Sequence, residues 1–362
     1  MLGRLLRALH VDGVLLAALV LVAGVGLVAL YSASGENMAM VLRQATRLAI
    51  AFGALLVVAQ IPPRVLYRAA PWLFWLGILL LGAVLAAGDV GKGAQRWLDL
   101  GIIRFQPSEI MKLAMPMMVA WLAFSRPLPV DLGRVAICGA LIALTAVLIA
   151  AQPDLGTALL VAAAGFFALF LAGLRWRIMI GLAVLGTALT PVLWHFMHGY
   201  QRQRVLMFLN PEQDPLGAGY HIIQSKIAIG SGGLFGKGWL NGTQSQLEFL
   251  PERSTDFIFA VFAEEFGLLG LLALLATYLF IIGRGLWIAA NAQDTFGRLL
   301  GGSLALTFFV YVFVNAGMVS GLLPVVGVPL PLFSYGGTAM VTLLAGFGIL
   351  MSIHTHRKLI SY

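Results

Sequence analysis

The chain is organised around residues 249–265, Phe249-Leu-Pro-Glu-Arg-Ser-Thr-Asp-Phe-Ile-Phe-Ala-Val-Phe-Ala-Glu-Glu265, which join the longest polar segment to a long apolar one. Asp256 lies at this junction, in a protein with only 10% charged residues. A carboxylate at the mouth of a membrane helix is costly to desolvate, so it usually has a function. We therefore expect the remaining chain to be a scaffold for this junction.

The composition predicts an all-α polytopic membrane protein. Of the 362 residues 60% are hydrophobic, and the mean hydropathy is +0.94, whereas soluble domains carry about 25% charged residues. Successive apolar runs of roughly 18–25 residues are long enough to cross a bilayer as helices. The ten predicted transmembrane helices are about 13–32, 42–61, 71–88, 107–125, 133–151, 157–174, 178–198, 256–283, 297–319 and 337–355. Residues 1–362 then form one transmembrane domain with a long extracytoplasmic loop, 199–255, between helices 7 and 8.

The net charge of +8 indicates membrane topology and not a nucleic-acid partner, because Lys and Arg mark the cytosolic side of spans. If the N-terminus is cytosolic, each inner segment carries two of them. These pairs are Arg4/Arg7, Arg64/Arg68, Arg126/Arg134, Arg175/Arg177, Arg284/Arg298 and Arg357/Lys358. We expect a multi-pass protein of the bacterial inner membrane, with both termini in the cytosol. Cys138 lies alone inside an apolar run, which is typical of a buried small hydrophobe.

Further cations fall on the outer half, where topology does not require them. Arg202, Lys237 and Arg253 lie in the long loop, and Arg96 and Lys112 lie beside or within a span. Such a group suggests an anionic ligand at the outer surface. The alternative for the loop residues is that long loops cross membranes regardless of charge.

Residues 104–112 predict the start of a helix at Pro107, because proline suits the first helical turn. Glu109 and Lys112 are then one turn apart on one face and can pair. An ion pair just inside the membrane is expected to line a water-filled cavity, although it can also lock two helices. Asp154, in a short outer turn, can cap the next helix or contact a ligand.

Asp256 is the strongest candidate for chemistry. Ser254 or Thr255 can cap the eighth span, which would place Asp256 in its first turn near the positive helix end. An ionised carboxylate there can accept a proton from a hydroxyl nucleophile, or hold a divalent cation that activates it. Glu264 and Glu265 lie deeper, and we expect them to hydrogen-bond neighbouring helices.

Two glycine-rich segments flank these residues. The run 230–238 resembles a phosphate-binding loop but follows no predicted strand. We instead expect the long loop 199–255 that contains it to be a flexible, substrate-gating loop, because loops of that length without regular structure are usually functional. Residues 321–338, with three prolines, predict a broken re-entrant segment that lines protein or water. It either meets a polar headgroup, with Ser334 as its candidate binding residue, or forms a tight structural turn. No Ser/His/acid arrangement and no Cys/His metal spacing stands out.

Three motifs resemble the SEDS family (shape, elongation, division and sporulation), and more its elongation branch than its division branch. They are Gly-Ser-Gly-Gly-Leu-Phe-Gly-Lys-Gly-Trp at 230–239, Gln-Leu-Glu-Phe-Leu-Pro-Glu-Arg-Ser-Thr-Asp-Phe-Ile-Phe-Ala at 246–260 and Leu-Pro-Val-Val-Gly-Val-Pro-Leu-Pro-Leu-Phe-Ser-Tyr-Gly-Gly at 323–337. The resemblance implies a ten-helix peptidoglycan glycosyltransferase that polymerises lipid II during cell elongation, on the periplasmic side of the membrane.

The same resemblance implies roles for individual residues. Asp256 matches the family's essential aspartate, which is thought to activate the acceptor hydroxyl, alone or with Mg²⁺ or Mn²⁺. The implied substrate-binding residues are Arg96, Trp97, Glu109, Lys112, Asp154 and Thr157, to which our own interpretation adds Arg202, Lys237, Arg253 and Ser334. The implied partners are lipid II, the growing glycan strand and a class B penicillin-binding protein. Two other functions fit the residues, a flippase for the lipid-linked precursor and a non-catalytic scaffold of the wall machinery.

Overall fold

A computed structural model describes residues 9–91, 94–99, 104–125, 128–197, 199–210, 219–247, 249–250 and 252–356. The predicted all-helical core is confirmed, since each predicted span coincides with a helix. These helices are α2 (Gly13–Ala33), α3 (Met38–Ala59), α4 (Pro63–Ala87), α5 (Pro107–Phe124), α6 (Leu132–Ala150), α7 (Leu155–Leu171), α8 (Trp176–Phe196), α12 (Ile258–Ala290), α13 (Thr295–Val319) and α14 (Thr338–Thr355). The predicted topology residues Arg4, Arg7, Arg126, Arg357 and Lys358 lie outside the described residues.

Length and composition define a multi-pass membrane protein. Among the described residues, seven helices are long and apolar enough to cross a bilayer, namely α2, α3, α4, α6, α12, α13 and α14. Leu155–Leu171 and Trp176–Pro191 are shorter apolar helices, and α5 carries the charged Glu109 and Lys112. Helical spans are the expected solution, because lipid offers no hydrogen-bond partner to an open backbone.

The helix starts follow from their capping residues. Asp12, Asn37, Asp154 and Asp294 each accept a hydrogen bond from a backbone N–H in the first turn of the helix that follows. These bonds satisfy amides that have no partner inside the helix. Helices α4 and α5 begin with proline, whose missing N–H costs nothing there.

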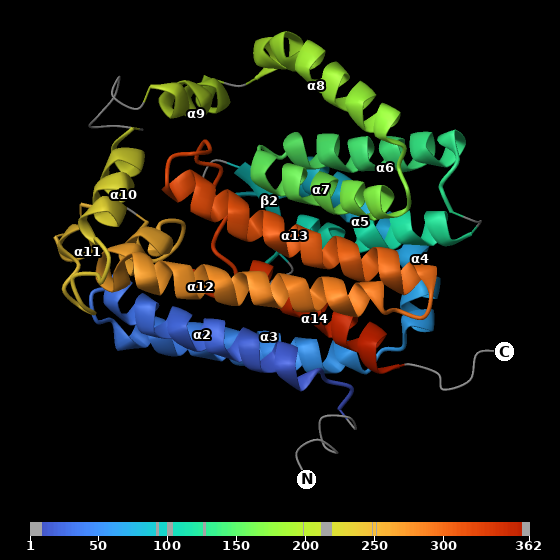
Figure 1. The fold of residues 1–362 in the computed structure, drawn as a ribbon. Coiled ribbons are helices and arrows are strands. Elements are labelled where there is room, and N and C mark those ends of the chain that lie inside the picture. Colours follow the sequence, from blue (N-terminus) through green and yellow to red (C-terminus); the bar gives the residue numbers. More distant parts are fainter. Residues whose placement is uncertain are drawn as a thin grey trace.

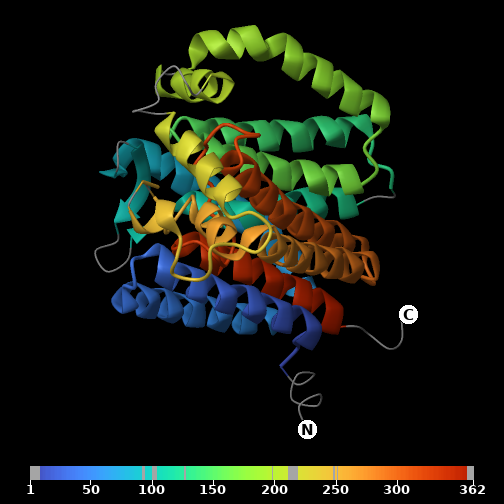
Figure 2. The ribbon, with the colours of Figure 1, turned by 60° about the vertical axis from the view of Figure 1, so that its left-hand side comes forward.

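The helices form a bundle from which one helix stands apart. Helices α2, α3, α12 and α14 pack side by side, and α13 lies between this group and α4 to α7 (Figures 1 and 2). Helix α8 lies beyond α6 and α7 in both views, and all residues from Ile180 to Pro191 are exposed. The core of the bundle therefore contains the other predicted spans.

The segment between α4 and α5 forms a small antiparallel sheet that the all-α prediction missed. Its strands are β1 (Asp89–Gly91), β2 (Ala94–Asp99) and β3 (Arg104–Phe105), in the order β1-β2-β3. In the register, Trp97 of β2 faces Asp89, and Leu98 faces Phe105. Short strands within one loop leave no hydropathy pattern comparable to that of a span. The sheet matters because it carries Arg96 and Trp97.

The described part of residues 199–255 contains helices where the sequence predicted a flexible loop. These helices are α9 (Gly199–Leu209), α10 (Tyr220–Ser231) and the single turn α11 (Thr243–Gln246). Helix α10 packs against α12, and the hydroxyl of Ser225 donates a 2.8 Å hydrogen bond to the carbonyl of Val319 at the end of α13.

The glycine run 230–238 inserts its backbone into a break in α12, so it does not form a free gate. Gly267 has φ 65° and ψ −166° and interrupts the helix. The carbonyls of Glu264 and Glu265 accept from the amides of Lys237 and Gly238, both at 3.0 Å. The amides of Leu268 and Leu269 donate to carbonyls of the run, those of Gly233 and Leu234. Each backbone group freed by the break thus has a partner.

Close approach explains the glycines at this break. A Cβ atom on Gly267 would lie 2.3 Å from the amide nitrogen of Gly236, and a Cβ atom on Gly236 would lie 2.1 Å from the carbonyl oxygen of Glu265. Both glycines also have positive φ, a region that costs other residues energy. Only glycine therefore allows the two backbones to meet.

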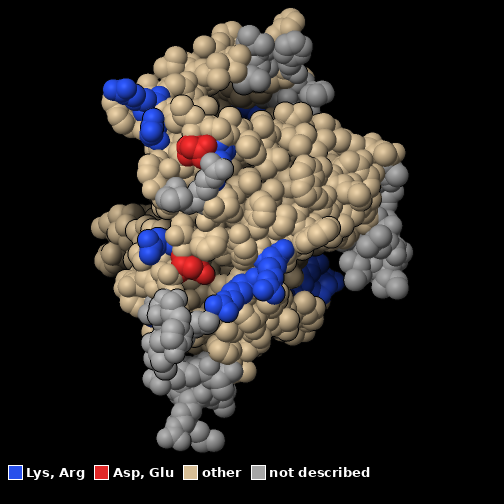
Figure 3. Space-filling view, turned by 90° about the vertical axis from the view of Figure 1, so that its right-hand side faces the viewer, with Lys and Arg blue, Asp and Glu red and all other residues tan. Residues whose placement is uncertain are grey.

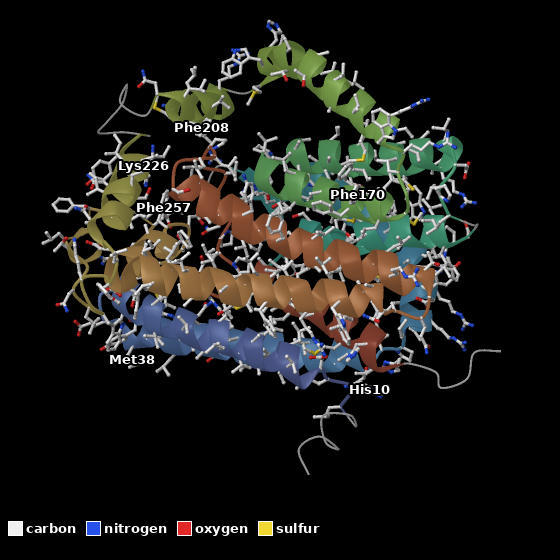
Figure 4. All side chains as sticks on the ribbon, in the orientation of Figure 1. His10, Met38, Phe170, Phe208, Lys226 and Phe257 are labelled. Carbon is white, nitrogen blue, oxygen red and sulfur yellow. The ribbon has the colours of Figure 1, made fainter. Side chains whose placement is uncertain are left out.

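Different segments of the chain meet at the two ends of the bundle. His10 lies at one end, and Met38, Lys226 and Phe257 lie at the other (Figure 4). The His10 end also holds the end of α14 and shows patches of Lys and Arg (Figure 3). There Asp12 pairs with Arg284 of α12 at 2.7 Å and with His354 of α14 at 3.2 Å. This cluster ties the start of α2 to two other helices.

Candidate active site

A polar cavity of about 240 Å³ lies at the Phe257 end, between α5, α7, α13, strand β2 and residues 327–339. Its side-chain lining is mostly polar, whereas the surrounding core is apolar. The polar lining residues are Arg96, Trp97, Gln106, Glu109, Lys112, Asp154, Thr157, Tyr311 and Thr338. Six of the residues predicted to bind substrate, Arg96, Trp97, Glu109, Lys112, Asp154 and Thr157, are thus brought together.

Lys112 and Glu109 line this cavity as an ion pair. Their predicted pairing is present, with the lysine Nζ 2.6 Å from Glu109 Oε1 and with side-chain exposures of 8% and 7%. Lys112 Nζ also lies 5.5 Å from the centre of the Tyr311 ring. Glu109 Oε2 is buried without a hydrogen-bond partner among the described residues. Buried charges at membrane depth persist where they face a polar cavity, and this pair lines one.

Arg96 lines the cavity and binds the turn before α7. Its guanidinium donates to the carbonyls of Gln152, at 3.3 Å, and Pro153, and it lies 3.7 Å from Asp154 Oδ2. Asp154 Oδ1 caps α7 by accepting from Thr157 N at 3.2 Å. The predicted capping by Asp154 is therefore present, and Asp154 also lines the cavity, while its contact with a ligand stays a prediction.

Asp256 is not among the residues that line this cavity, and it does not lie where the sequence placed it. Helix α12 begins at Ile258 with Phe257 as its N-cap, so Asp256 precedes the first turn and gains less from the helix end than expected. The residue is half-buried. A Cβ atom on Gly327, which lines the cavity, would lie 3.6 Å from Asp256 Oδ2. The carboxylate thus lies beside Gly327, a residue of the cavity lining that has no side chain.

Arg202 and Lys237 do not line this cavity. Arg202 donates to the carbonyls of Trp194 and His195, at 2.9 and 2.6 Å, and so joins α9 to the end of α8. Lys237 Nζ lies 2.7 Å from Glu264 Oε1, a carboxylate with 0% exposure. In this structure both cations hold segments of residues 199–255 in place.

Arg253 and Ser334 also lie outside the cavity lining. Arg253 is half-buried, and its Nη2 would lie 3.5 Å from a Cβ atom on Gly35. The hydroxyl of Ser334 accepts from Leu330 N at 2.8 Å, and its carbonyl accepts from Gln44 Nε2 at 3.0 Å. Ser334 therefore stabilises the fold of residues 321–338. This agrees with the alternative that the segment forms a tight structural turn.

The deeper glutamates hydrogen-bond neighbouring segments, as expected. Glu265 accepts from the hydroxyl of Ser32 in α2. Glu264 Oε1 accepts from Lys237 Nζ, from the Thr243 hydroxyl at 3.1 Å and from Gln244 N at 3.1 Å. Both glutamates therefore stabilise the break in α12 and lie apart from the cavity lining.

Sequence reasoning missed Gln106, Tyr311 and Asn315. Gln106 Nε2 donates to Asp154 Oδ2 at 3.0 Å, and Tyr311 lines the cavity beside Lys112. Asn315 Nδ2 donates to the carbonyls of Asp256 and Val328. The available signal was that Tyr311 and Asn315 are polar residues in an apolar span, one turn apart and on one face.

The cavity does not form a metal cage from protein groups alone. Among the described residues, no three His, Cys, Asp or Glu side chains are grouped to hold an ion. Asp154 is engaged by Arg96 and Gln106, and Glu109 by Lys112. A divalent cation at Asp256 stays a prediction, and it would need further oxygen ligands from a substrate.

The fold and cavity define a polytopic membrane protein with a polar site at one end of its bundle. The chain belongs to the FtsW/RodA/SpoVE family of cell cycle proteins, whose pattern it matches over residues 7–359. It is 60% identical over 353 residues to the peptidoglycan glycosyltransferase MrdB of Escherichia coli K12, covering 97% of this chain and 95% of that protein. It is 40% identical over 333 residues to MrdB of Helicobacter pylori 26695, covering 89% and 84%.

Solved structures agree with this assignment. One, described as the structural coordination of polymerization and crosslinking by a peptidoglycan synthase complex, matches with a TM-score of 0.83 and 33% identity, covering 96% of this chain and 99% of that one. The rod shape determining protein RodA of Thermus thermophilus matches with a TM-score of 0.72 and 29% identity, covering 96% and 98%. The predicted family and its elongation branch are thereby confirmed.

Proposed function

We propose that this peptidoglycan glycosyltransferase polymerises lipid II, with Asp256 as the group that activates the acceptor hydroxyl. The enzyme class follows from relatives of that name at 60% identity over nearly the whole chain. The role of Asp256 rests on one observation. This half-buried residue has its carboxylate beside Gly327, which lines the same cavity as Lys112 and Arg96.

The geometry supports a direct displacement. Asp256 takes the proton of an acceptor sugar hydroxyl, whose oxygen attacks the anomeric carbon of the donor sugar. The bond from that carbon to the diphosphate oxygen breaks, and undecaprenyl diphosphate leaves with the bonding electrons. Lys112 and Arg96 lie in the same cavity, where cations stabilise the charge that develops on a departing diphosphate.

Asp256 would be the residue that holds a divalent cation, Mg²⁺ or Mn²⁺, in this proposal. When bound, the cation would supply positive charge beside the leaving group. Lys112 and Arg96 supply cationic charge without it.

The membrane arrangement is part of the proposal. We infer that all ten matched helices cross the inner membrane as one domain over residues 1–362, with residues 199–255 between the seventh and eighth. The Arg-bearing His10 end would face the cytosol together with both termini, and the cavity would then open to the periplasm. The match to a synthase complex for polymerization and crosslinking supports a class B penicillin-binding protein as partner.

A reconstitution experiment tests the activity. Purified protein in proteoliposomes, with lipid II and with or without the transpeptidase, should form glycan polymer detectable on gels. Adding Mg²⁺, Mn²⁺ or a chelator tests the cation. Movement of lipid II headgroups across the bilayer without polymer would favour the flippase alternative, and an inert chain that still restores rod shape would favour the scaffold.

A further inference from the structure

Asn315 links the aspartate stretch to the re-entrant segment. Its side chain lies in α13 with 0% exposure. The side-chain amide donates to the carbonyl of Asp256 at 3.0 Å and to the carbonyl of Val328 at 2.8 Å. One nitrogen therefore joins α13 to two irregular stretches that are far apart in sequence.

This arrangement has a cost that an apolar residue would avoid. Asn315 Oδ1 is buried and has no hydrogen-bond partner among the described residues. A buried polar atom without a partner destabilises a fold, and α13 is otherwise strongly apolar around it. The two hydrogen bonds that the asparagine donates offset this cost.

Those two bonds hold the backbones of Asp256 and Val328 next to each other. Val328 directly follows Gly327, the glycine that Asp256 Oδ2 approaches at the cavity edge. A second link holds the same two stretches, since Tyr335 N donates to the carbonyl of Ser254 at 2.9 Å. Because Asp256 and Val328 bond to the same nitrogen, a shift of either stretch changes the position of the carboxylate beside Gly327.

We propose that Asn315 is a positioning residue for glycosyl transfer, which holds the Asp256 carboxylate at the height of the cavity without touching the substrate. This inference rests on the proposed function of Asp256. It predicts a larger effect on the chemical step than on substrate binding. The amide nitrogen of Asn315 donates to the carbonyls of Asp256 and Val328, and not to the cavity residues Arg96 and Lys112.

The test compares Asn315→Ala with Ser303→Ala in purified protein supplied with lipid II. Ser303 is a matched control, since it is also fully buried in α13 and donates one tertiary hydrogen bond, 2.6 Å to the carbonyl of Ala164. Polymerisation rates across lipid II concentrations give kcat and KM, and thermal unfolding gives the folded fraction.

We expect Asn315→Ala to lower kcat about 10- to 100-fold, the scale of a misplaced reacting group, with KM within about twofold of wild type. Ser303→Ala should lose similar thermal stability and keep its kcat. An Asn315→Ala variant with the kcat of Ser303→Ala, or a loss fully accounted for by its unfolded fraction, would overturn the proposal.

Asn315→Ser covers the case in which the alanine variant does not fold. The serine hydroxyl can donate to only one of the two carbonyls, so kcat should lie between the wild-type value and zero. A wild-type kcat would count against a positioning role for Asn315. Asp256→Asn measured alongside separates the two claims. Activity in Asp256→Asn overturns the proposed function, whereas its inactivity together with normal Asn315 variants overturns only this inference.

Discussion

Two Lys–Glu pairs in this protein share their chemistry and differ in their surroundings. Lys112 and Glu109 meet at 2.6 Å, and Lys237 and Glu264 meet at 2.7 Å. The carboxylates are 7% and 0% exposed. As isolated pairs they would be assigned the same role.

Their neighbours give them different roles. The Lys112 pair lines the polar cavity with Arg96 and Asp154. The Lys237 pair lies where the glycine run enters the break of α12, and Glu264 also accepts from Thr243 and Gln244 of the same segment. The comparison teaches that an intramembrane ion pair marks a site only when it borders a cavity.

The largest effect is expected from neutralising the cavity pair. Lys112→Met together with Glu109→Gln leaves no buried charge unpaired, so the protein should fold with near-normal thermal stability. Polymerisation should nevertheless fall at least about 100-fold, because a cation opposite the leaving group is lost. Gel assays of polymer together with thermal unfolding would show this, and a folded double variant with normal activity would contradict it.

The Lys237–Glu264 pair should respond differently when its charges are removed. Lys237→Met alone leaves the Glu264 carboxylate buried without its cation and should cost about 3–5 kcal/mol of stability. Adding Glu264→Gln should restore most of the stability and the activity together. If the stable double variant remained inactive with a raised KM for lipid II, Lys237 would instead belong among the substrate-binding residues, as the sequence predicted.

A glycine comparison sharpens the account of the loop. Gly236→Ala should lower the thermal midpoint more than Gly233→Ala, since both have positive φ but only the Gly236 Cβ would collide with the Glu265 carbonyl. Positive φ alone costs alanine about 1–2 kcal/mol, and the collision adds to that. Equal midpoints in the two variants would contradict insertion of the run into α12.

The smallest effect concerns the ion cluster at the far end of α12. Burial raises the pKa of Asp12, but hydrogen bonds from His354, Arg284 and Leu15 outweigh it and lower that pKa below its usual value. Asp12→Asn keeps the cap oxygen and should lose about 1–3 kcal/mol at neutral pH. A lowered carboxyl pKa stabilises the fold fully above the unfolded pKa, and this stabilisation is lost as pH falls toward the lower folded pKa. The difference should therefore shrink steadily as pH drops below about 4. A gap that persists in acid would contradict this.

Span positions and the Lys112–Glu109 pair could be predicted because their signals are local. Apolar runs have the length of a bilayer, and an i, i+3 spacing places two side chains together whatever surrounds them. Lys237 carried no such signal, since its partner Glu264 is reached only through the fold. The start of α12 was also misplaced, because Phe257 acts as N-cap although Ser254 and Thr255 have the side chains that usually cap.

The most direct test of the central claim is the polymerisation rate of Asp256→Asn, an isosteric change that removes only the charge and the proton-accepting oxygen. The account predicts a protein with wild-type thermal unfolding and unchanged lipid II binding that makes no detectable polymer. Polymerisation at the wild-type rate would contradict it.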